Sequence, residues 1–354
     1  MTQRKLHWDL MRVFAIFAVV VQHVCNRCIR YATPDQLDWQ VCKAVHSSLV
    51  WAVPIFVMIS GALFLVPDKE FSIKKLYGKY ILRLAIAYLF WSCINTFLFS
   101  TIKYYAPFSF AGIWNTFTGM LKGGYPYLWF LWMILGLYIM IPILRACLKT
   151  MSDTVLLYWL AAGFTFGCII PLILNWNTAN VLFGSNMTIM NQSMFGVYVF
   201  YFVLGYTLEH RPHLLTNYKL LYLAGILGVI VAVAGTAILS RYYMSNIVFL
   251  LENHSPAITF TSIAIYIGLR NYIAANQETG KITQLASALV PYVFGIYLVH
   301  NIFLDSVGIA IIEKYSSQIP LSVIMLILIP GTCVISLVTV WLIRLLKPIA
   351  KFIT

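Results

Sequence analysis

Long apolar runs without an Asp, Glu, Lys or Arg constrain the fold of this chain more than any other feature. A helix needs about 20 mainly apolar residues to cross the ~30 Å hydrocarbon layer of a bilayer. Apolar residues make up 61% of the chain and charged residues only 10%, a composition that excludes a soluble globular domain. Runs of about the required length cover residues 44–67, 84–102, 123–144, 220–240, 253–269, 282–304 and 315–343.

Three further spans complete the expected set. The charge-free stretch from 154 to 208 is too long for one crossing, and its central Pro, Gly and Asn residues predict a loop between two helices, 154–174 and 193–208. The apolar run 8–25 contains Asp9, Arg12 and His23, so we interpret it as a retained helix and not as a signal peptide. The sequence therefore predicts an all-α polytopic membrane protein with a bundle of about ten transmembrane helices, in which residues 1–354 form a single membrane-embedded domain.

The distribution of basic residues predicts the orientation of this bundle. Lys and Arg are enriched in cytoplasmic loops. With the N-terminus inside, ten spans place 16 Lys and Arg residues on the cytoplasmic side and 7 on the other side. We therefore expect both termini in the cytoplasm and the protein in the cell (cytoplasmic) membrane. The net charge of +13 arises from these scattered residues and not from a basic run, so we expect no nucleic-acid partner.

Seven cysteines allow two interpretations. Cys25, Cys28 and Cys42, with His23 and His46 near them in sequence, have some features of a redox or zinc cluster. Most of the seven lie in apolar runs, where cysteine behaves as a small hydrophobic residue. We expect buried free thiols and no metal.

Arg12 and His23 are the strongest functional candidates in the first span. A charged group at bilayer depth costs at least ~2.5 kcal/mol, so each is a functional hypothesis by default. Eleven residues correspond to about 20° more than three helical turns, so both side chains lie on one face, ~16 Å apart along the axis. We expect both to face one cavity. The alternatives are that Arg12 is an interfacial anchor and that His23 is a core histidine with a backbone partner.

Three later segments also contain candidates. The Ser60-Gly61 pair after Pro54 is typical of close helix packing. Basic residues at the predicted cytoplasmic end of the third span act as a topology signal and are also compatible with phosphate binding: Lys74, Lys75, Lys79 and Arg83.

The ninth span contains His300, Asn301 and Asp305 within an otherwise apolar run. His300 and Asp305 are about 140° apart around a helix and need not touch. Asn301 and Asp305 are four residues apart, so they share a face and can orient a neighbouring group.

The order of these segments resembles acyltransferase family 3, particularly its members that are similar to surface polysaccharide O-acetyltransferases. Arg12, ten residues and His23 are similar to the family's first-helix signature. Residues 54–61 resemble its Ser-Gly segment, and residues 295–300 resemble its late Gly-x-Tyr-Leu-x-His segment. The likeness covers nearly the whole chain in the same order.

One position departs from the family pattern. Members often have Arg-x-x-Arg at the start of the third helix, whereas Tyr80 stands three residues before Arg83 in this chain. Lys79 would then supply the missing charge.

The resemblance implies transfer of an acyl group, acetyl in the first instance, from acetyl-CoA to a hydroxyl of a surface polysaccharide or a lipid-linked sugar. Together with the chemistry of the residues, it assigns His23 as general base and Arg12 as a fixed positive group near the donor or the developing oxyanion. Lys79 and Arg83 would bind the CoA phosphates.

His300, with Asp305, is a second candidate for base or acceptor binding. The alternative function is a multi-span transporter or flippase, because intramembrane His, Asp and Arg residues also mark transport paths.

The topology yields the first testable prediction. A reporter that is active only outside the cytoplasm should stay inactive when it is fused after Thr354, and active when it is inserted between 175 and 192. Activity after Thr354 would contradict the orientation that the basic residues indicate.

Overall fold

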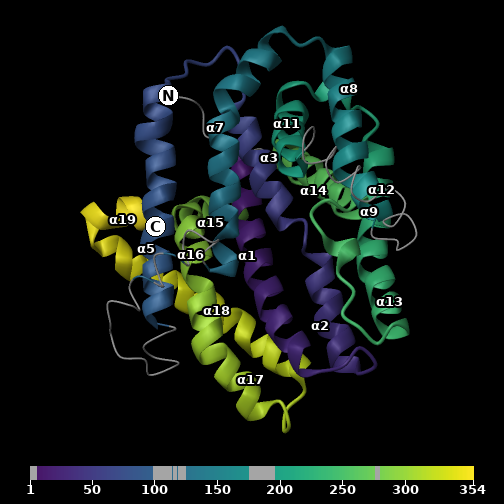
Figure 1. The fold of residues 1–354 in the computed structure, drawn as a ribbon, viewed down its shortest axis with the longest axis vertical. Coiled ribbons are helices and arrows are strands. Elements are labelled where there is room, and N and C mark those ends of the chain that lie inside the picture. The colour runs from purple at the N-terminus through teal and green to yellow at the C-terminus, as the bar shows by residue number, and fades with distance from the viewer. Residues whose placement is uncertain (1–5, 99–113, 115–117, 119–124, 175–195, 276–279) are drawn as a thin grey trace.

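The computed structural model describes residues 6–98, 114, 118, 125–174, 196–275 and 280–354, and within these ranges it contains helices and no strands (Figure 1). The first half of the chain forms α1 (Leu6–Cys28), α2 (Leu37–Ser48), α3 (Ala52–Phe64), α4 (Ile73–Lys75), the π-helical turn η2 (Leu76–Ile81), α5 (Leu82–Phe97), the 3₁₀ turn η4 (Pro126–Leu128), α7 (Trp129–Thr150), α8 (Asp153–Phe164), η5 (Thr165–Ile169) and α9 (Ile170–Leu174). The second half forms α11 (Val197–His210), α12 (Tyr218–Ile230), η7 (Val231–Gly235), α13 (Thr236–Tyr242), α14 (Pro256–Ala275), α15 (Lys281–Leu289), η9 (Val290–Tyr292), α16 (Val293–Phe303), η10 (Leu304–Gly308), α17 (Ile309–Tyr315), α18 (Leu321–Leu345) and α19 (Lys347–Ile353).

The predicted all-α membrane fold is confirmed. Within the described ranges, seven helical segments are long and apolar enough to cross a membrane: Leu6–Tyr31, Leu37–Phe64, Pro126–Thr150, Asp153–Leu174, Tyr218–Tyr242, Lys281–Tyr315 and Leu321–Leu345. The other three predicted spans coincide with α5, α11 and α14, which are shorter or carry more polar residues. The loop predicted within 154–208 falls largely on residues 175–195, outside the described ranges. The number of ten spans and the positions of the termini stay predictions.

Helix α1 lies in the middle of the bundle (Figure 1) and packs against α2, α3, α14, α15, α16 and α18. Buried aliphatic side chains from Met11 to Val24 follow it along most of its length. Because α1 is surrounded, its polar residues meet other helices or internal cavities. This arrangement lets one helix present Arg12 and His23 to the interior.

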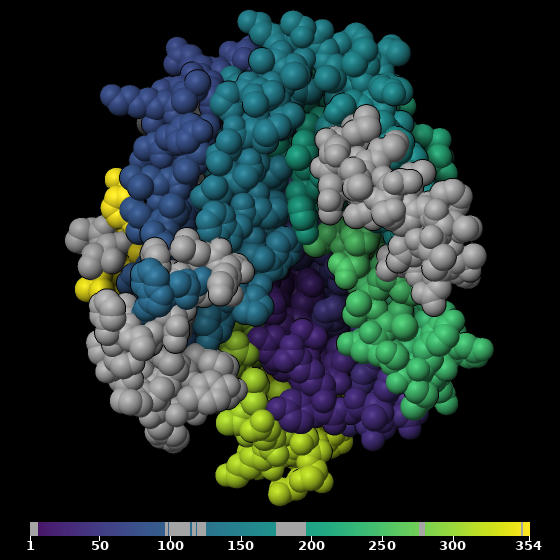
Figure 2. All heavy atoms as spheres, in the orientation of Figure 1, coloured from purple at the N-terminus to yellow at the C-terminus, as the bar shows by residue number. Residues whose placement is uncertain are grey.

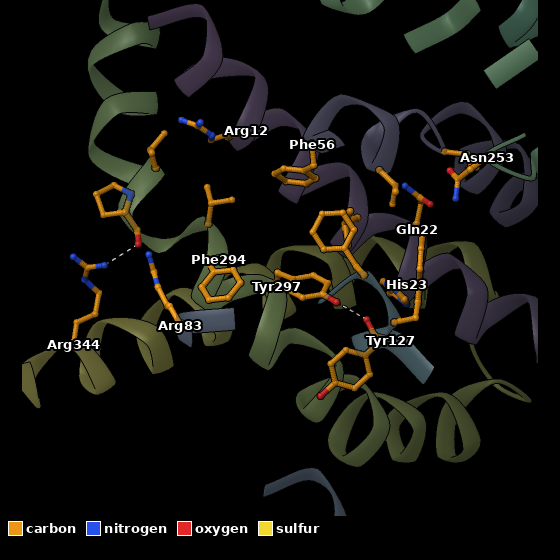
Figure 3. Close-up of a pocket in the computed structure, with 18 residues that line it drawn as sticks. Arg12, Gln22, His23, Phe56, Arg83, Tyr127, Asn253, Phe294, Tyr297 and Arg344 are labelled. Atoms are coloured by element: carbon orange, nitrogen blue, oxygen red, sulfur yellow. Dashed lines mark hydrogen bonds between the residues drawn. The ribbon is translucent and has the colours of Figure 1, made fainter. Parts of the chain in front are cut away.

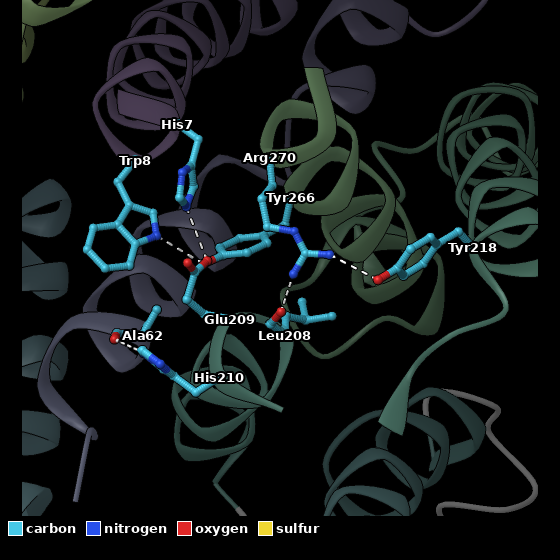
Figure 4. A network of polar contacts seen from close by, with 9 residues as sticks. All are labelled: His7, Trp8, Ala62, Leu208, Glu209, His210, Tyr218, Tyr266 and Arg270. Atoms are coloured by element: carbon cyan, nitrogen blue, oxygen red, sulfur yellow. Dashed lines mark hydrogen bonds and ion pairs between the residues drawn. The ribbon is translucent and has the colours of Figure 1, made fainter. Parts of the chain in front are cut away.

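A polar network holds the first turn of α1 in place (Figure 4). The Glu209 carboxylate on α11 lies 3.1 Å from Nε2 of His7 and accepts a hydrogen bond of 3.0 Å from the Tyr266 hydroxyl of α14. Trp8 donates its indole N–H to the same hydroxyl at 3.2 Å. These hydrogen bonds connect α1, α11 and α14 at Trp8, four residues before Arg12.

The cysteine cluster is part of the apolar core. Cys25, Cys28 and Cys42 are buried free thiols, and the sulfur of Cys25 lies 3.3 Å from that of Met325 on α18. Their burial agrees with the interpretation of these cysteines as small hydrophobic residues.

Two glycines permit the close contact between α3 and α11. A Cβ atom at Gly61 would lie 1.7 Å from the carbonyl oxygen of Phe202, and one at Gly205 would lie 2.0 Å from that of Met58. The backbones therefore touch directly, which confirms the packing role predicted for the Ser-Gly pair.

We expect Gly61→Ala and Gly205→Ala to destabilise the protein by about 1–3 kcal/mol or more, because each added methyl group meets a backbone carbonyl that cannot move aside. Thermal unfolding of the protein in detergent measures the effect. The matched control is Gly136→Ala in the middle of α7, where a Cβ atom meets nothing within 4 Å. An equal loss of stability in all three variants would contradict this account.

Candidate active site

A central cavity of about 600 Å³ runs through the bundle beside α1 (Figure 3). Both Arg12 and His23 line it, as their spacing on one helical face predicted. On the face drawn in Figure 2, the surface is hollowed between α7 and the segment near residue 250, with α1 at the floor of the hollow. The other residues that line the cavity are Val19, Gln22, Val50, Val53, Phe56, Arg83, Tyr127, Trp129, Phe130, Asn253, Val290, Pro291, Val293, Phe294, Tyr297 and Arg344.

One end of the central cavity is basic, with Arg12, Arg83 and Arg344 grouped on one side of Figure 3. The guanidinium of Arg12 lies 3.4 Å from the buried carboxylate of Asp9. Arg83 lies over the ring of Phe294, with 5.1 Å between its guanidinium carbon and the ring centroid, and donates to the carbonyl oxygen of Thr354. These three cations suit an anionic ligand.

Arg344 was not among the residues predicted for the site. It donates to the carbonyl of Pro291 at 2.7 Å and lies beside the cavity wall formed by η9. In the sequence it had the appearance of a topology signal at the end of the last span. No local pattern connects it with Arg12, which is more than 300 residues away.

The opposite end of the central cavity is polar and neutral, with His23, Gln22 and Asn253 grouped together (Figure 3). Gln22 donates to the carbonyl of Leu49 at 2.8 Å, and Asn253 donates to the hydroxyl of Tyr198 at 3.1 Å. Within the described part of the chain, His23 has no hydrogen-bond partner. Its imidazole is therefore available to a ligand in the cavity.

Aromatic rings form the middle of the central cavity. Phe130 contacts both Phe56 and Tyr297, with centroid separations of 6.1 and 5.6 Å. The Tyr297 hydroxyl donates to the carbonyl of Tyr127 at 2.6 Å and is thereby turned away from the cavity centre (Figure 3). This apolar section suits a flexible chain with few charges.

A second cavity, which we call the basic cavity, has a volume of about 670 Å³ and shares Arg12, Arg83 and Phe294 with the central cavity. Lys69 and Lys75 also line it and form no ion pair within the described residues. The buried Arg145 donates to the carbonyls of Phe64, Pro67 and Lys69 and so fixes the segment after α3.

Lys79 lies outside the linings of these cavities. The sequence paired it with Arg83, four residues later on the same face of an ideal α-helix. In the structure Lys79 lies within the π-helical turn η2 and Arg83 lies in α5, and the i to i+5 bonding of a π turn changes the angular spacing between them. Lys79 is exposed with its ammonium 5.6 Å from the ring of Tyr80, and Lys75 lines the basic cavity instead.

A third cavity of about 520 Å³, the Arg27 cavity, adjoins the polar end of the central cavity and shares His23, Tyr127 and Trp129 with it. Most of its remaining lining is polar or aromatic, and two residues are aliphatic: Asn26, Arg27, Arg30, Tyr125 and Asp305, with Pro126 and Ile309. His23 therefore lies where two cavities meet, whereas Arg12 and Arg83 lie at the junction with the basic cavity.

His300 and Asp305 lie next to this junction. The rings of His300 and His23 have centroids 5.0 Å apart. Asp305 lines the Arg27 cavity and forms an ion pair of 2.7 Å with Arg27. Asn301 accepts a hydrogen bond from the same guanidinium at 3.0 Å, so Asn301 and Asp305 do share a face and orient one neighbour, as their spacing predicted.

The chain matches a known protein family. A family model described as an acyltransferase domain matches residues 6–344. No curated protein and no solved structure matches the chain. Because the family model covers nearly the whole sequence, the chain belongs to acyltransferase family 3 and is a membrane acyltransferase.

Proposed function

We propose that this protein, in the cell membrane, transfers an acetyl group from acetyl-CoA to a hydroxyl of a surface polysaccharide or a lipid-linked sugar. The observation that carries the proposal is the order of the three cavities. Arginines lie where the basic cavity meets the central one, and His23, which has no hydrogen-bond partner among the described residues, lies where the central cavity meets the Arg27 cavity. Two substrates can thus approach one histidine from opposite ends.

The basic cavity suits the phosphates of CoA. Arg83, Lys69 and Lys75 supply cationic donors, and charge-assisted bonds to phosphate are among the strongest in proteins. The aromatic middle of the central cavity would hold the pantetheine arm, with the thioester near His23. Arg12, ~16 Å from His23 along α1, is then better placed for the donor phosphates than for the oxyanion.

The Arg27 cavity suits a carbohydrate acceptor. Tyr125, Tyr127 and Trp129 offer ring faces, and Asn26 and Arg30 offer hydrogen-bond donors. A sugar has apolar ring faces and polar edges, so this mixture of aromatic and polar side chains is complementary to it. Under the predicted topology this cavity is on the outer side of the membrane.

The chemical step requires one base. His23 takes the proton of the acceptor hydroxyl while the oxygen of that hydroxyl attacks the thioester carbonyl carbon and forms a C–O bond. Collapse of the tetrahedral intermediate breaks the C–S bond, and the departing CoA thiolate takes the proton back from the His23 imidazolium. The products are an acetyl ester and CoA with a free thiol.

A transporter or flippase would also have a chain of polar cavities. Membership in an acyltransferase family favours the transferase. Appearance of free CoA thiol from acetyl-CoA separates the two, because transport leaves the thioester intact.

We expect His23→Ala to reduce acetyl transfer by about 10² to 10⁴ in rate while CoA binding and membrane insertion stay near the unmodified level, since a lost general base touches no phosphate. Transfer of labelled acetyl to the membrane glycans of the native host measures it. His213→Ala is the matched control, because His213 is exposed and bonds only Asp153 at 2.8 Å. Retained activity in His23→Ala would make the histidine structural.

We expect Arg83→Ala to weaken acetyl-CoA binding by roughly tenfold or more, the effect of losing one charge-assisted contact of ~1.5–3 kcal/mol. Titration of the purified protein with CoA measures the affinity. Lys79→Ala removes the charge of a nearby residue that lines neither cavity, so this substitution should reduce the affinity for CoA less than Arg83→Ala does. Unchanged affinity in both variants would exclude this region as the phosphate site.

A further inference from the structure

A continuous polar chain connects Asp305 to His300 on the side of His23. Arg27 is buried on α1 with 8% of its surface exposed, and it donates to Asp305 through Nε at 3.0 Å and Nη2 at 2.7 Å. The same Nη2 donates to Oδ1 of Asn301 at 3.0 Å. Nδ2 of Asn301 lies 3.1 Å from Nε2 of His300.

The donor and acceptor roles along this chain follow from Arg27. A guanidinium has only donors, so the Asn301 amide must turn its oxygen toward Arg27 and its NH₂ group toward His300. Nε2 of His300 must then be an unprotonated acceptor. The other nitrogen, Nδ1, lies 3.0 Å from the carbonyl of Ile296 and carries the proton that it donates to that oxygen.

Both nitrogens of His300 are therefore occupied in a single arrangement, the neutral Nδ1–H tautomer. Asn301 and His300 have no solvent exposure, so water does not compete for these bonds. A second proton on Nε2 would require the Asn301 amide to flip, which would turn its NH₂ group toward the Arg27 cation. The charged or titratable groups that face His300 and His23 are Arg27, Arg30, His46, Tyr127, Tyr297 and Asp305.

We infer that Arg27 and Asn301 are positioning residues that hold His300 neutral beside His23. This inference rests on the proposed function, in which His23 becomes an imidazolium during each transfer. The two ring centroids are only 5.0 Å apart, so a charged His300 would repel that imidazolium. A neutral ring at the same place lets His23 accept the proton.

Two substitutions at Asn301 separate this role from a structural one. Asn301→Asp keeps the shape and the bond to Arg27, but it presents an acceptor to Nε2 and so favours a doubly protonated His300. Asn301→Leu removes both bonds and leaves His300 neutral. A structural role predicts that Asp is tolerated better than Leu. We expect the reverse for activity, with kcat about three- to tenfold lower in Asn301→Asp than in Asn301→Leu and with little change in the KM for acetyl-CoA. The new carboxylate is shared with Arg27, so it offsets only part of the positive charge that His300 gains beside His23.

A double variant tests the cause. Gln at position 300 cannot become a cation. In the His300→Gln background, Asn301→Asp should therefore lower the activity much less than it does in the unmodified protein. Asn271→Asp and Asn271→Leu are the control substitutions, because Asn271 is likewise a helical asparagine whose amide donates to a side chain of another helix, the hydroxyl of Tyr222 at 3.3 Å, although it is only half-buried and lies away from this site. They should differ little from each other. An inactive His300→Gln would show that His300 itself transfers protons and would overturn the inference.

A spectroscopic measurement is independent of activity. The ¹⁵N spectrum of histidine-labelled protein in detergent should show His300 as the neutral Nδ1–H tautomer at pH 7, and as an imidazolium in Asn301→Asp; the signal is assigned by its absence in His300→Gln. Any other tautomer in the unmodified protein, or equal activities of the two Asn301 variants, would overturn the inference. If the spectra agree but acetyl-CoA yields no free CoA thiol, the proposed function fails and the assignment of the tautomer stands.

Discussion

The high free-energy cost of placing a charge in lipid determines the position of α1 in the middle of this bundle. Helix α1 carries Asp9, Arg12, His23 and Arg27, and on insertion scales each charge facing the hydrocarbon would cost ~2.5–3.5 kcal/mol. The other helices enclose α1, so these groups meet cavities or partners and not lipid. Arg12, His23 and Arg27 line cavities, and Asp9 and Arg27 form ion pairs. The site is thus a consequence of where the charged helix must lie.

The sequence predicted which side chains share a face of one helix, but it did not predict which residues of distant segments are in contact. The common face of Arg12 and His23 and that of Asn301 and Asp305 follow from helical periodicity alone. Arg27 follows the predicted first span, 8–25, and was therefore among the seven basic residues assigned to the outer side, yet it is buried and bonded to Asp305, 278 residues later. Nothing in the local pattern distinguishes such a partner from a topology signal.

Lys79 shows a different limit of sequence reasoning. Its spacing from Arg83 places both on one face only if the intervening turn is α-helical. The π-helical turn η2 breaks that periodicity, and π turns arise from packing that a one-dimensional pattern does not contain. The third-helix position at which the chain departs from its family's pattern lies in the same turn, at Tyr80.

The two histidines illustrate how one bundle can assign different tasks to the same side chain. A general base must change its protonation in every cycle, so its nitrogens must be accessible, and His23 has no partner within the described chain. A neighbour 5.0 Å away must not change its charge in that cycle, since the two charges would interact through a poorly screened interior. Bonding both nitrogens of His300 meets that requirement, and the fixed cation of Arg27, itself neutralised by Asp305, sets the direction of those bonds. In the proposed reaction, the ion pair would thereby act through orientation rather than through its net charge.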